Sequence, residues 1–253
     1  MAQDNSFFGT EKVGHLLLRL APPVMLAQLI QALYNIVDSY YVGQYSKDGL
    51  AALSVIFPVQ LLISALAIGT GVGVNTIMSK FDGLSNQKAA DETAGVGFLL
   101  SVITWVAFSL ITCCLMGVYT RISLSMPQAQ EYACVYGRIV CGFSFGIFLE
   151  SNWTKVLQAR GDMKTPMVAQ VIGALTNIFL DWFLIFGIGF FPRLGIAGAA
   201  IATVIGQILA AVIVGVKAFH RVPPLSICKQ YVKPVYRAGA PNILMNALCT
   251  IYI

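Results

Sequence analysis

The sequence predicts an all-α, polytopic membrane protein: a six-helix transmembrane lobe followed by the start of a seventh helix. Only 11% of its 253 residues are charged and 57% are hydrophobic, and the mean hydropathy is +0.77. Soluble domains carry about 25% charged residues, so a soluble chain of this length would need far more polar surface. The apolar residues also gather into runs long enough to cross a hydrocarbon core of ~30 Å.

Six apolar runs are predicted to form transmembrane helices. At a rise of 1.5 Å per residue, about 20 residues cross the bilayer, and several runs exceed this length, which permits tilt. A seventh run begins near Ala238 and continues to Ile253. The predicted domains are an amino-terminal lobe (1–217), a cytoplasmic linker (218–237) and the start of helix 7 of a second lobe (238–253). The six runs lie at about 16–42, 50–79, 94–118, 133–157, 166–189 and 195–217.

Lysine and arginine are distributed unevenly between the two ends of these runs. With a cytoplasmic N-terminus, twelve of the 16 basic residues lie in inner segments, and only Lys47, Arg121, Arg138 and Arg193 lie in outer ones. Because inner loops of membrane proteins carry the excess of basic residues, we predict a multi-pass protein of the inner (plasma) membrane with a cytoplasmic N-terminus. Topology thus explains the net charge of +5, and no nucleic-acid partner is expected.

The end of the chain resembles its beginning. Residues 237–253 match residues 19–35 at four of 17 positions, among them Pro23 with Pro241. A repeat unit with an even number of spans restarts in the same orientation, as in transporters built from parallel halves. We therefore expect the chain to be incomplete, to lack a carboxy-terminal lobe as its partner, and not to transport on its own.

A polar stripe marks one face of the first predicted helix. Gln28, Gln31, Asn35 and Asp38 follow one another at spacings of three, four and three residues, and Tyr34 borders them. At ~100° per residue, the four lie within about 80° of the helix surface. Such a stripe must face protein or a water-filled cavity. Contacts between helices would explain the glutamines, whereas Asp38 requires a cation, a proton or several donors and is predicted to be functional.

The fifth and sixth predicted helices carry similar groups. Gln170, Asn177 and Asp181 share one face of the fifth helix, and Thr203 and Gln207 lie four residues apart on the sixth. A carboxylate in the middle of a membrane helix costs ~2.5–3.5 kcal/mol on insertion scales, which makes it a candidate functional residue. The alternative is a buried polar contact that joins two helices.

Two carboxylates in such a setting can be accommodated in two ways. Either one acid holds a proton, because burial and the neighbouring carboxylate disfavour a second negative charge, or a small cation such as Na⁺ is bound by carboxylate, amide and hydroxyl oxygens. No Lys or Arg in the same spans neutralises them. In both cases, arrival of an ion changes the charge inside the lobe, as coupled transport requires. No cofactor is expected beyond this coupling ion, H⁺ or Na⁺.

The fourth predicted helix offers weaker candidates. Glu150 and Asn152 are possible contacts for a cationic organic substrate, because both lie in an otherwise apolar run. Glu150 is only five residues from Lys155 and the expected cytoplasmic edge, so the alternative is that it pairs with Lys155 or reaches the membrane surface.

Two short motifs superficially suggest an enzyme. Residues 69–73 read GTGVG, which is not the G-x-G-x-x-G of nucleotide-binding loops and does not follow a strand. Residues 142–146 match the G-x-S-x-G of hydrolases around Ser144, but inside a predicted helix. Small residues that allow close helix packing explain both motifs better, and no enzymatic activity is expected.

Several segments resemble the multidrug and toxic compound extrusion (MATE) transporters. GDMKTPM followed by NIFLDWFLIFG, within residues 156–187, resembles the loop 4–5 and helix 5 signature of that family. Three further segments follow in the order of the family and extend the resemblance over most of the chain: YNIVDSYYVG at 34–43, SKFDGLSNQKAADETA at 79–94 and GIAGAAIATVIGQ at 195–207.

The resemblance implies an architecture and an ion site. MATE transporters hold two six-helix lobes in one chain, and in one prokaryotic branch the amino-terminal lobe couples ions through side chains on helices 1, 5 and 6. Those side chains correspond to Asp38, Asn177, Asp181 and Thr203 of this sequence. Acidic sites on helices 7 and 8, which other branches use, lie beyond this chain.

The leading interpretation is the amino-terminal lobe of a secondary antiporter in the lipid bilayer. It would export small organic, often cationic, compounds while H⁺ or Na⁺ moves inward. One alternative is a lipid-linked oligosaccharide flippase of the wider superfamily, but such proteins often use a basic central cavity, and the Lys and Arg residues here gather at membrane edges. A non-transporting membrane scaffold is the other alternative, although it has no need of buried acids.

Overall fold

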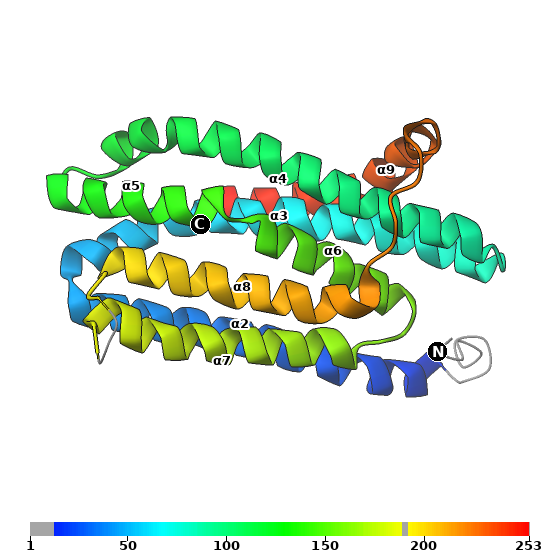
Figure 1. Cartoon of the computed structure of the whole chain (residues 1–253), viewed down its shortest axis with the longest axis horizontal. Helices are drawn as coiled ribbons and strands as arrows, with labels where there is room; N and C mark the ends of the chain where they lie inside the picture. The colour runs from blue at the N-terminus through cyan, green and yellow to red at the C-terminus, as the bar shows by residue number, and fades with distance from the viewer. Residues whose placement is uncertain (1–12, 189–191, 253) are drawn as a thin grey trace.

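Long helices packed side by side along the longest axis of the molecule make up this computed structural model (Figure 1). The structure describes residues 13–188 and 192–252, and no strand occurs within them. The helices are, in chain order, α2 (Val13–Tyr45), α3 (Lys47–Gly83), α4 (Gln87–Ser123), α5 (Pro127–Gly142), α6 (Phe145–Ala159), α7 (Lys164–Phe186), α8 (Ile196–Ala218) and α9 (Leu225–Tyr252).

These helices confirm the predicted all-helical membrane fold. In the described part of the chain, α3, α4, α7 and α8 are each long and apolar enough to cross a membrane, and the bent pair α5–α6 adds a fifth such span. The first predicted run coincides with α2, which is not among the helices that meet these conditions, so its crossing stays a prediction. The division of the chain into domains also stays a prediction.

Apolar side chains cover the outside of the bundle. Leu18, Ile122 and Val216 are 77%, 81% and 82% exposed, and many other large hydrophobic residues on every long helix are exposed as well. Soluble proteins rarely present so much contiguous apolar surface, whereas lipid chains are its natural solvent. The protein is therefore a multi-pass membrane protein.

Two buried apolar clusters occupy the two halves of the bundle. One includes Ile56, Phe148 and Ile185 and lies towards the end that holds the α2–α3 turn (left in Figure 1). The other includes Val74 and Val214 and lies towards the end that holds the α3–α4 turn. The polar groups predicted to bind ions and cargo lie between these clusters, which hold the surrounding helices in place.

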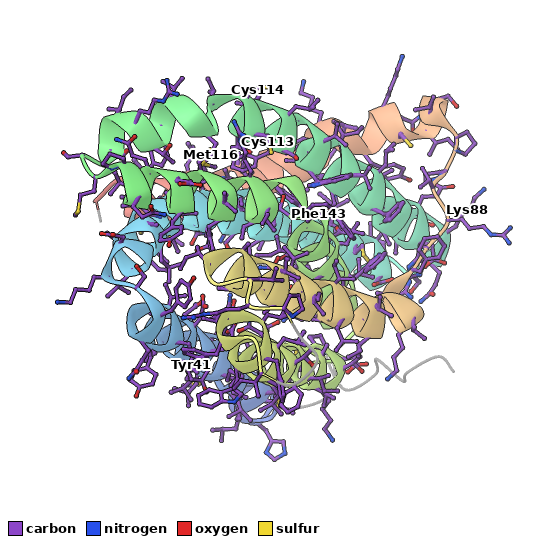
Figure 2. All side chains as sticks on the ribbon, turned by 60° about the vertical axis from the view of Figure 1, so that its left-hand side comes forward. Tyr41, Lys88, Cys113, Cys114, Met116 and Phe143 are labelled. Carbon is purple, nitrogen blue, oxygen red and sulfur yellow. The ribbon has the colours of Figure 1, made fainter. Side chains whose placement is uncertain are left out.

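The fourth predicted span is not one straight helix. It breaks at Phe143 and Ser144, where α5 and α6 meet at a bend of 43°. The Ser144 hydroxyl donates to the Cys141 carbonyl (2.8 Å), and the Trp105 indole nitrogen of α4 donates to the Gly142 carbonyl (3.2 Å). Side-chain donors thus bond to carbonyls that would accept backbone N–H groups in a continuous helix. Insertion of a side chain in this way is a recognised cause of sharp kinks. Phe143 is 56% exposed at the break (Figure 2).

The GDMKTP segment folds as a tight turn that starts α7. Gly161 has φ 78°, a conformation open to glycine without strain. The Asp162 carboxylate accepts hydrogen bonds from the backbone N–H (3.0 Å) and the hydroxyl (2.7 Å) of Thr165, so it satisfies a free donor of the first helical turn. Lys217 of α8 donates to the same hydroxyl (2.9 Å). The polar residues of this motif therefore fix where α7 begins.

The basic residues near the turns fit the predicted orientation without testing it. Lys80, Lys88, Arg160 and Lys217 lie near the same end of the bundle (right in Figure 1), and Lys88 extends away from the helices (Figure 2). Lys12, counted among the inner residues, lies outside the described residues. The cytoplasmic position of this end stays a prediction.

The last helix packs tightly against α3. It starts already at Leu225, inside the segment expected to be a linker. The backbones of α3 and α9 touch, because a side-chain carbon added at Gly73 would overlap the carbonyl oxygen of Val235, and one at Gly239 would overlap that of Gly69. Only glycine allows helices to approach this closely.

Replacing Gly73 by leucine should separate α9 from α3. The added side chain has no free volume, and overpacking of this kind costs about 1–3 kcal/mol or more. We expect faster hydrogen–deuterium exchange in the α9 amides, with α7 and α8 unchanged. Gly83→Ala is the matched control, since an added carbon there meets no atom within 4 Å. Equal protection of α9 in both variants would show that this contact contributes little.

Candidate functional site: buried acids beside a cavity

Three helices bring the four predicted ion-binding residues into the interior. Asp38 of α2, Asn177 and Asp181 of α7 and Thr203 of α8 are only 5%, 2%, 0% and 4% exposed. The Asn177 amide donates to the Thr203 hydroxyl (3.3 Å). The carboxylates of Asp38 and Asp181 are close enough to interact electrostatically. The structure therefore gathers residues that are separated by up to 165 positions in the sequence, as Asp38 and Thr203 are.

Several oxygens in this region have no donor. Both carboxylate oxygens of Asp181, one of Asp38, and the amide oxygens of Asn177 and Gln207 are buried without a hydrogen-bond partner. Buried polar atoms are nearly always satisfied, and an uncompensated buried carboxylate is especially costly. A set made only of acceptors suits a positive species: a proton shared between the acids, or a small cation with a preference for oxygen ligands.

Glycines determine how closely α7 and α8 approach. A side-chain carbon at Gly206 would lie 2.7 Å from the carbonyl oxygen of Gly173, and one at Gly173 would lie 2.8 Å from that of Gly206. Gly146 of α6 fits in the same way against the backbone of α8 at Ile208 (3.0 Å). These contacts bring the Thr203 hydroxyl within reach of Asn177.

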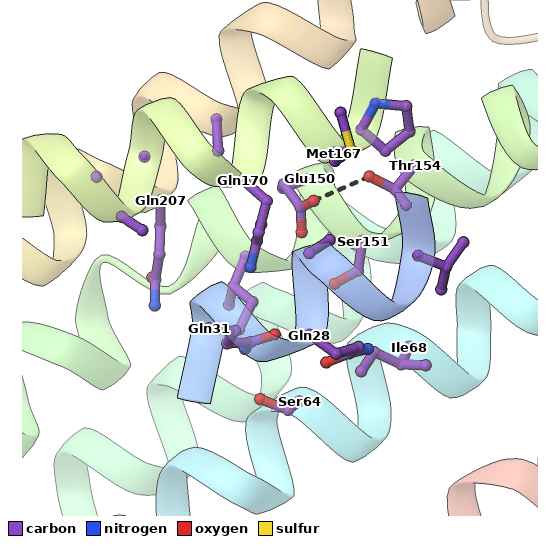
Figure 3. Close-up of a pocket in the computed structure, with 18 of the residues that line it drawn as sticks. Gln28, Gln31, Ser64, Ile68, Glu150, Ser151, Thr154, Met167, Gln170 and Gln207 are labelled. Carbon is purple, nitrogen blue, oxygen red and sulfur yellow. Dashed lines mark hydrogen bonds between the residues drawn. The ribbon is translucent and has the colours of Figure 1, made fainter. Parts of the chain in front are cut away.

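A cavity of about 140 Å³ is lined by Asn177 and Thr203 and by further residues of α2, α3, α6, α7 and α8. In Figure 3, the Gln170 side chain of α7 extends towards Gln31 of α2, and Gln28 of α2 lies beside Ile68 of α3. The predicted supporting residues Gln31, Tyr34, Gln170 and Gln207 all line this cavity. A predominantly apolar cavity with a few convergent polar groups is the usual form of a small-molecule site.

The remaining predicted polar residues lie elsewhere. Asn35 lines a second cavity of about 90 Å³, which shares Gln31, Tyr34 and Gln207 with the first. Asn152 lines neither cavity. Its amide oxygen points at α4, 2.6 Å from where a side-chain carbon of Gly97 would lie. The predicted role of Asn152 as a cargo contact therefore lacks the necessary geometry, because the residue is on a different face of α6 from Glu150.

Glu150 and Lys155 both line the cavity. Glu150 accepts a hydrogen bond from the Thr154 hydroxyl (2.9 Å; Figure 3), and the Lys155 ammonium donates to the Gln158 side chain (2.9 Å). No ion pair within 4 Å joins these two described residues. Glu150 and Lys155 therefore do not form a direct ion pair, although their charges attract each other. The expected position of Lys155 at the membrane edge stays a prediction.

Sequence reasoning missed Tyr136 and Gln60. Tyr136 of α5 is 1% exposed, and its hydroxyl accepts a hydrogen bond from the Gln60 amide (3.3 Å). The same hydroxyl faces Thr203 and interacts electrostatically with both buried acids. A single tyrosine in an apolar run gives no signal of its own, because its role depends on how α5 meets α8.

Apolar spans that enclose unpaired acids beside a cavity are typical of membrane transporters. The MatE family model matches residues 23–183, more than half of the chain. The chain belongs to this family.

The relatives are described as transporters. The chain is 31% identical over 202 residues to an FAD transporter of Shewanella oneidensis, which covers 78% of this chain and 44% of the relative. It is 27% identical over 240 residues to a probable multidrug resistance protein NorM of Thermotoga maritima, covering 91% and 51%. The chain thus spans about half the length of these relatives.

Solved structures agree with the fold. A MOP superfamily transporter from Pyrococcus furiosus, for which reversed polarity of the binding pocket suggests a different function, superposes with a TM-score of 0.86. The two are 26% identical, and the match covers 97% of this chain and 55% of the other. An outward-facing multidrug resistance MATE family transporter matches with a TM-score of 0.85, 26% identity and the same coverage.

Proposed function

We propose that the chain is the amino-terminal lobe of a secondary antiporter that exports small organic compounds while H⁺ or Na⁺ moves inward. The observation that carries this proposal is the group of unpaired buried oxygens around Asp38, Asn177 and Asp181 next to a cavity of ligand size. A structural role would leave such acceptors bonded to donors. A site that must alternately take up and release a positive ion cannot have them permanently satisfied.

The site and the cavity are connected through shared residues. Asn177 and Thr203 belong to the ion group and also line the cavity. An ion that binds between α2, α7 and α8 therefore changes both the charge and the shape of the cavity wall. Ligand and ion can then influence each other's affinity, because each alters the free energy of the arrangement that the other binds.

The test is ethidium export by the full-length protein in proteoliposomes with imposed gradients. We expect inward flow of Na⁺, of H⁺ or of both to drive ethidium outward. This movement should be faster than in liposomes without protein. The two gradients, applied separately, identify the coupling ion. Ethidium movement that responds to neither gradient would contradict ion-coupled export of organic cations.

The structure also bears on the other interpretations. A flippase for a pyrophosphate-linked cargo needs a cavity with excess positive charge, whereas Lys155 shares this cavity with the carboxylate of Glu150. The hydrolase interpretation requires an accessible nucleophile. Ser144 is fully buried and its hydroxyl donates to the Cys141 carbonyl, so we expect no labelling of Ser144 by a fluorophosphonate probe.

A further inference from the structure

Two opposite charges share the cavity wall without forming a direct ion pair. Glu150 and Lys155 both come from α6, one turn and a half apart, and no ion pair within 4 Å joins them. Each is held by a neutral neighbour instead, Glu150 by Thr154 and Lys155 by Gln158. The two charges attract each other without direct contact, and both lose solvation in a partly apolar cavity, so a ligand with complementary charges that contacts each of them would stabilise both.

The position of Lys155 is fixed by its surroundings. Its backbone carbonyl accepts a hydrogen bond from the Asn75 amide of α3 (2.8 Å), which ties α6 to α3 at this point. Its side-chain stem lies against Gly71, where an added carbon would come within 2.8 Å of the Lys155 Cγ. The glycine thus leaves room for the stem, and the ammonium group is aimed by packing rather than left free in solvent.

The rest of the wall suits a flat apolar ring. Ile68, Met163 and Met167 line the cavity together with the glutamine amides, and methionine side chains adapt readily to aromatic ligands. The volume of about 140 Å³ is comparable with cavities of ~150 Å³ that accept one benzene ring. The cavity therefore combines space for one ring with a carboxylate and an ammonium.

We propose that Lys155 and Glu150 make this cavity selective for dipolar cargo: a small aromatic ring that carries both a cationic and an anionic group. Glu150 takes the cationic end and Lys155 the anionic end. The inference rests on the proposed export function and narrows its cargo from organic cations to zwitterions. Lys155 is then the residue that determines specificity, since Glu150 alone would accept any organic cation.

Equilibrium binding of two matched compounds tests the proposal. N-methylnicotinate is a zwitterion, and N-methylnicotinamide has the same ring and cation with a neutral amide in place of the carboxylate. Binding is measured on the purified full-length protein in nanodiscs, with no ion gradient, by scintillation proximity with the tritiated compounds. We expect the wild type to bind the zwitterion about ten-fold or more tighter than the amide, since the ion pair between the Lys155 ammonium and the carboxylate is replaced by a hydrogen bond to a neutral carbonyl.

The variants assign the preference to a residue. Lys155→Gln should weaken binding of the zwitterion about ten-fold and change that of the amide by less than about two-fold, whereas Glu150→Gln should weaken both. Lys155→Arg should keep the preference. Lys164→Gln, at an exposed lysine outside the cavity, is the control and should leave both affinities unchanged.

The outcomes separate this inference from the proposed function. Equal affinity of the wild type for the two compounds, or no binding of the zwitterion, would overturn the inference whether or not any variant folds. So would a zwitterion preference that survives in Lys155→Gln. If the predicted binding pattern holds but no gradient drives export of either ethidium or N-methylnicotinate, the antiporter proposal fails while the selectivity of the cavity stands.

Discussion

Replacing Asp181 with asparagine is expected to abolish ion-driven export without unfolding the protein. Asparagine has almost the same shape but no negative charge, and Asp181 is fully buried with both carboxylate oxygens unpaired. The residue would thus lose the ability to take up a proton or a cation while the packing of α7 is kept. We expect export by Asp181→Asn in proteoliposomes to fall to that of protein-free liposomes under the gradient that drives the wild type.

The stability of the same variant distinguishes function from structure. If Asp181 held α7 in place through hydrogen bonds, its loss would lower the thermal unfolding temperature. Since its oxygens have no donors, neutralising it removes an unfavourable buried charge, so we expect an unchanged or higher unfolding temperature in detergent. Loss of transport together with retained stability is the signature of a residue kept for its chemistry.

Two further variants complete this experiment. Asp38→Asn should have the same effect, because the two carboxylates interact and α2 supplies the only other buried acid of the group. Asp48→Asn, in the first turn of α3, is the control and should export normally. Unimpaired export by both Asp38→Asn and Asp181→Asn would refute the proposed ion site, whatever the fold.

Sequence reasoning located the polar faces but not their partners. The spacing of Gln31 and Asp38 on α2, and of Asn177 and Asp181 on α7, correctly predicted that these residues point into the protein. Helical periodicity carries this information, because an amphipathic pattern reports the direction of each side chain. Ion binding by Asp38, Asn177 and Asp181 stays a prediction, which the burial of their oxygens without hydrogen-bond donors supports.

The missed features depend on how helices meet. The break at Phe143 depends on Ser144 within the run and also on Trp105 of another helix, which donates a hydrogen bond to a carbonyl at the bend. The contact with Trp105 cannot be read from residues 133–157. The sequence did not predict that Lys155 lines the cavity, where its stem lies against Gly71. Tyr136 gains its position from α5 packing beside α8. How two helices align depends on which of their small residues face each other, and the sequence does not distinguish these from other small residues.

The contact between α7 and α8 at Gly206 tests whether a small residue determines how these two helices align. Replacing Gly206 with valine should separate α7 from α8, because the added carbon alone would lie 2.7 Å from the Gly173 carbonyl oxygen and 3.2 Å from the Asn177 Cβ. The contact is between backbones and cannot be relieved by rotating a side chain. We expect a loss of about 3 kcal/mol or more in stability, at the upper end of overpacking, and loss of the hydrogen bond from Asn177 to Thr203.

The comparison with a permissive glycine isolates the effect of the contact. Gly117 lies within α4, where the nearest atom to an added carbon is the Arg138 guanidinium at 3.8 Å. Gly117→Ala should therefore be neutral or raise stability by up to about 1 kcal/mol, because alanine favours the helix over glycine. Gly206→Ala should already destabilise, and Gly206→Val more strongly, as measured by thermal unfolding of the full-length protein in detergent. The ion site needs α7 and α8 in contact. Ion-driven export should therefore be lower in Gly206→Ala than in Gly117→Ala, and lowest in Gly206→Val. Full export by Gly206→Val would mean that this helix contact does not position the site.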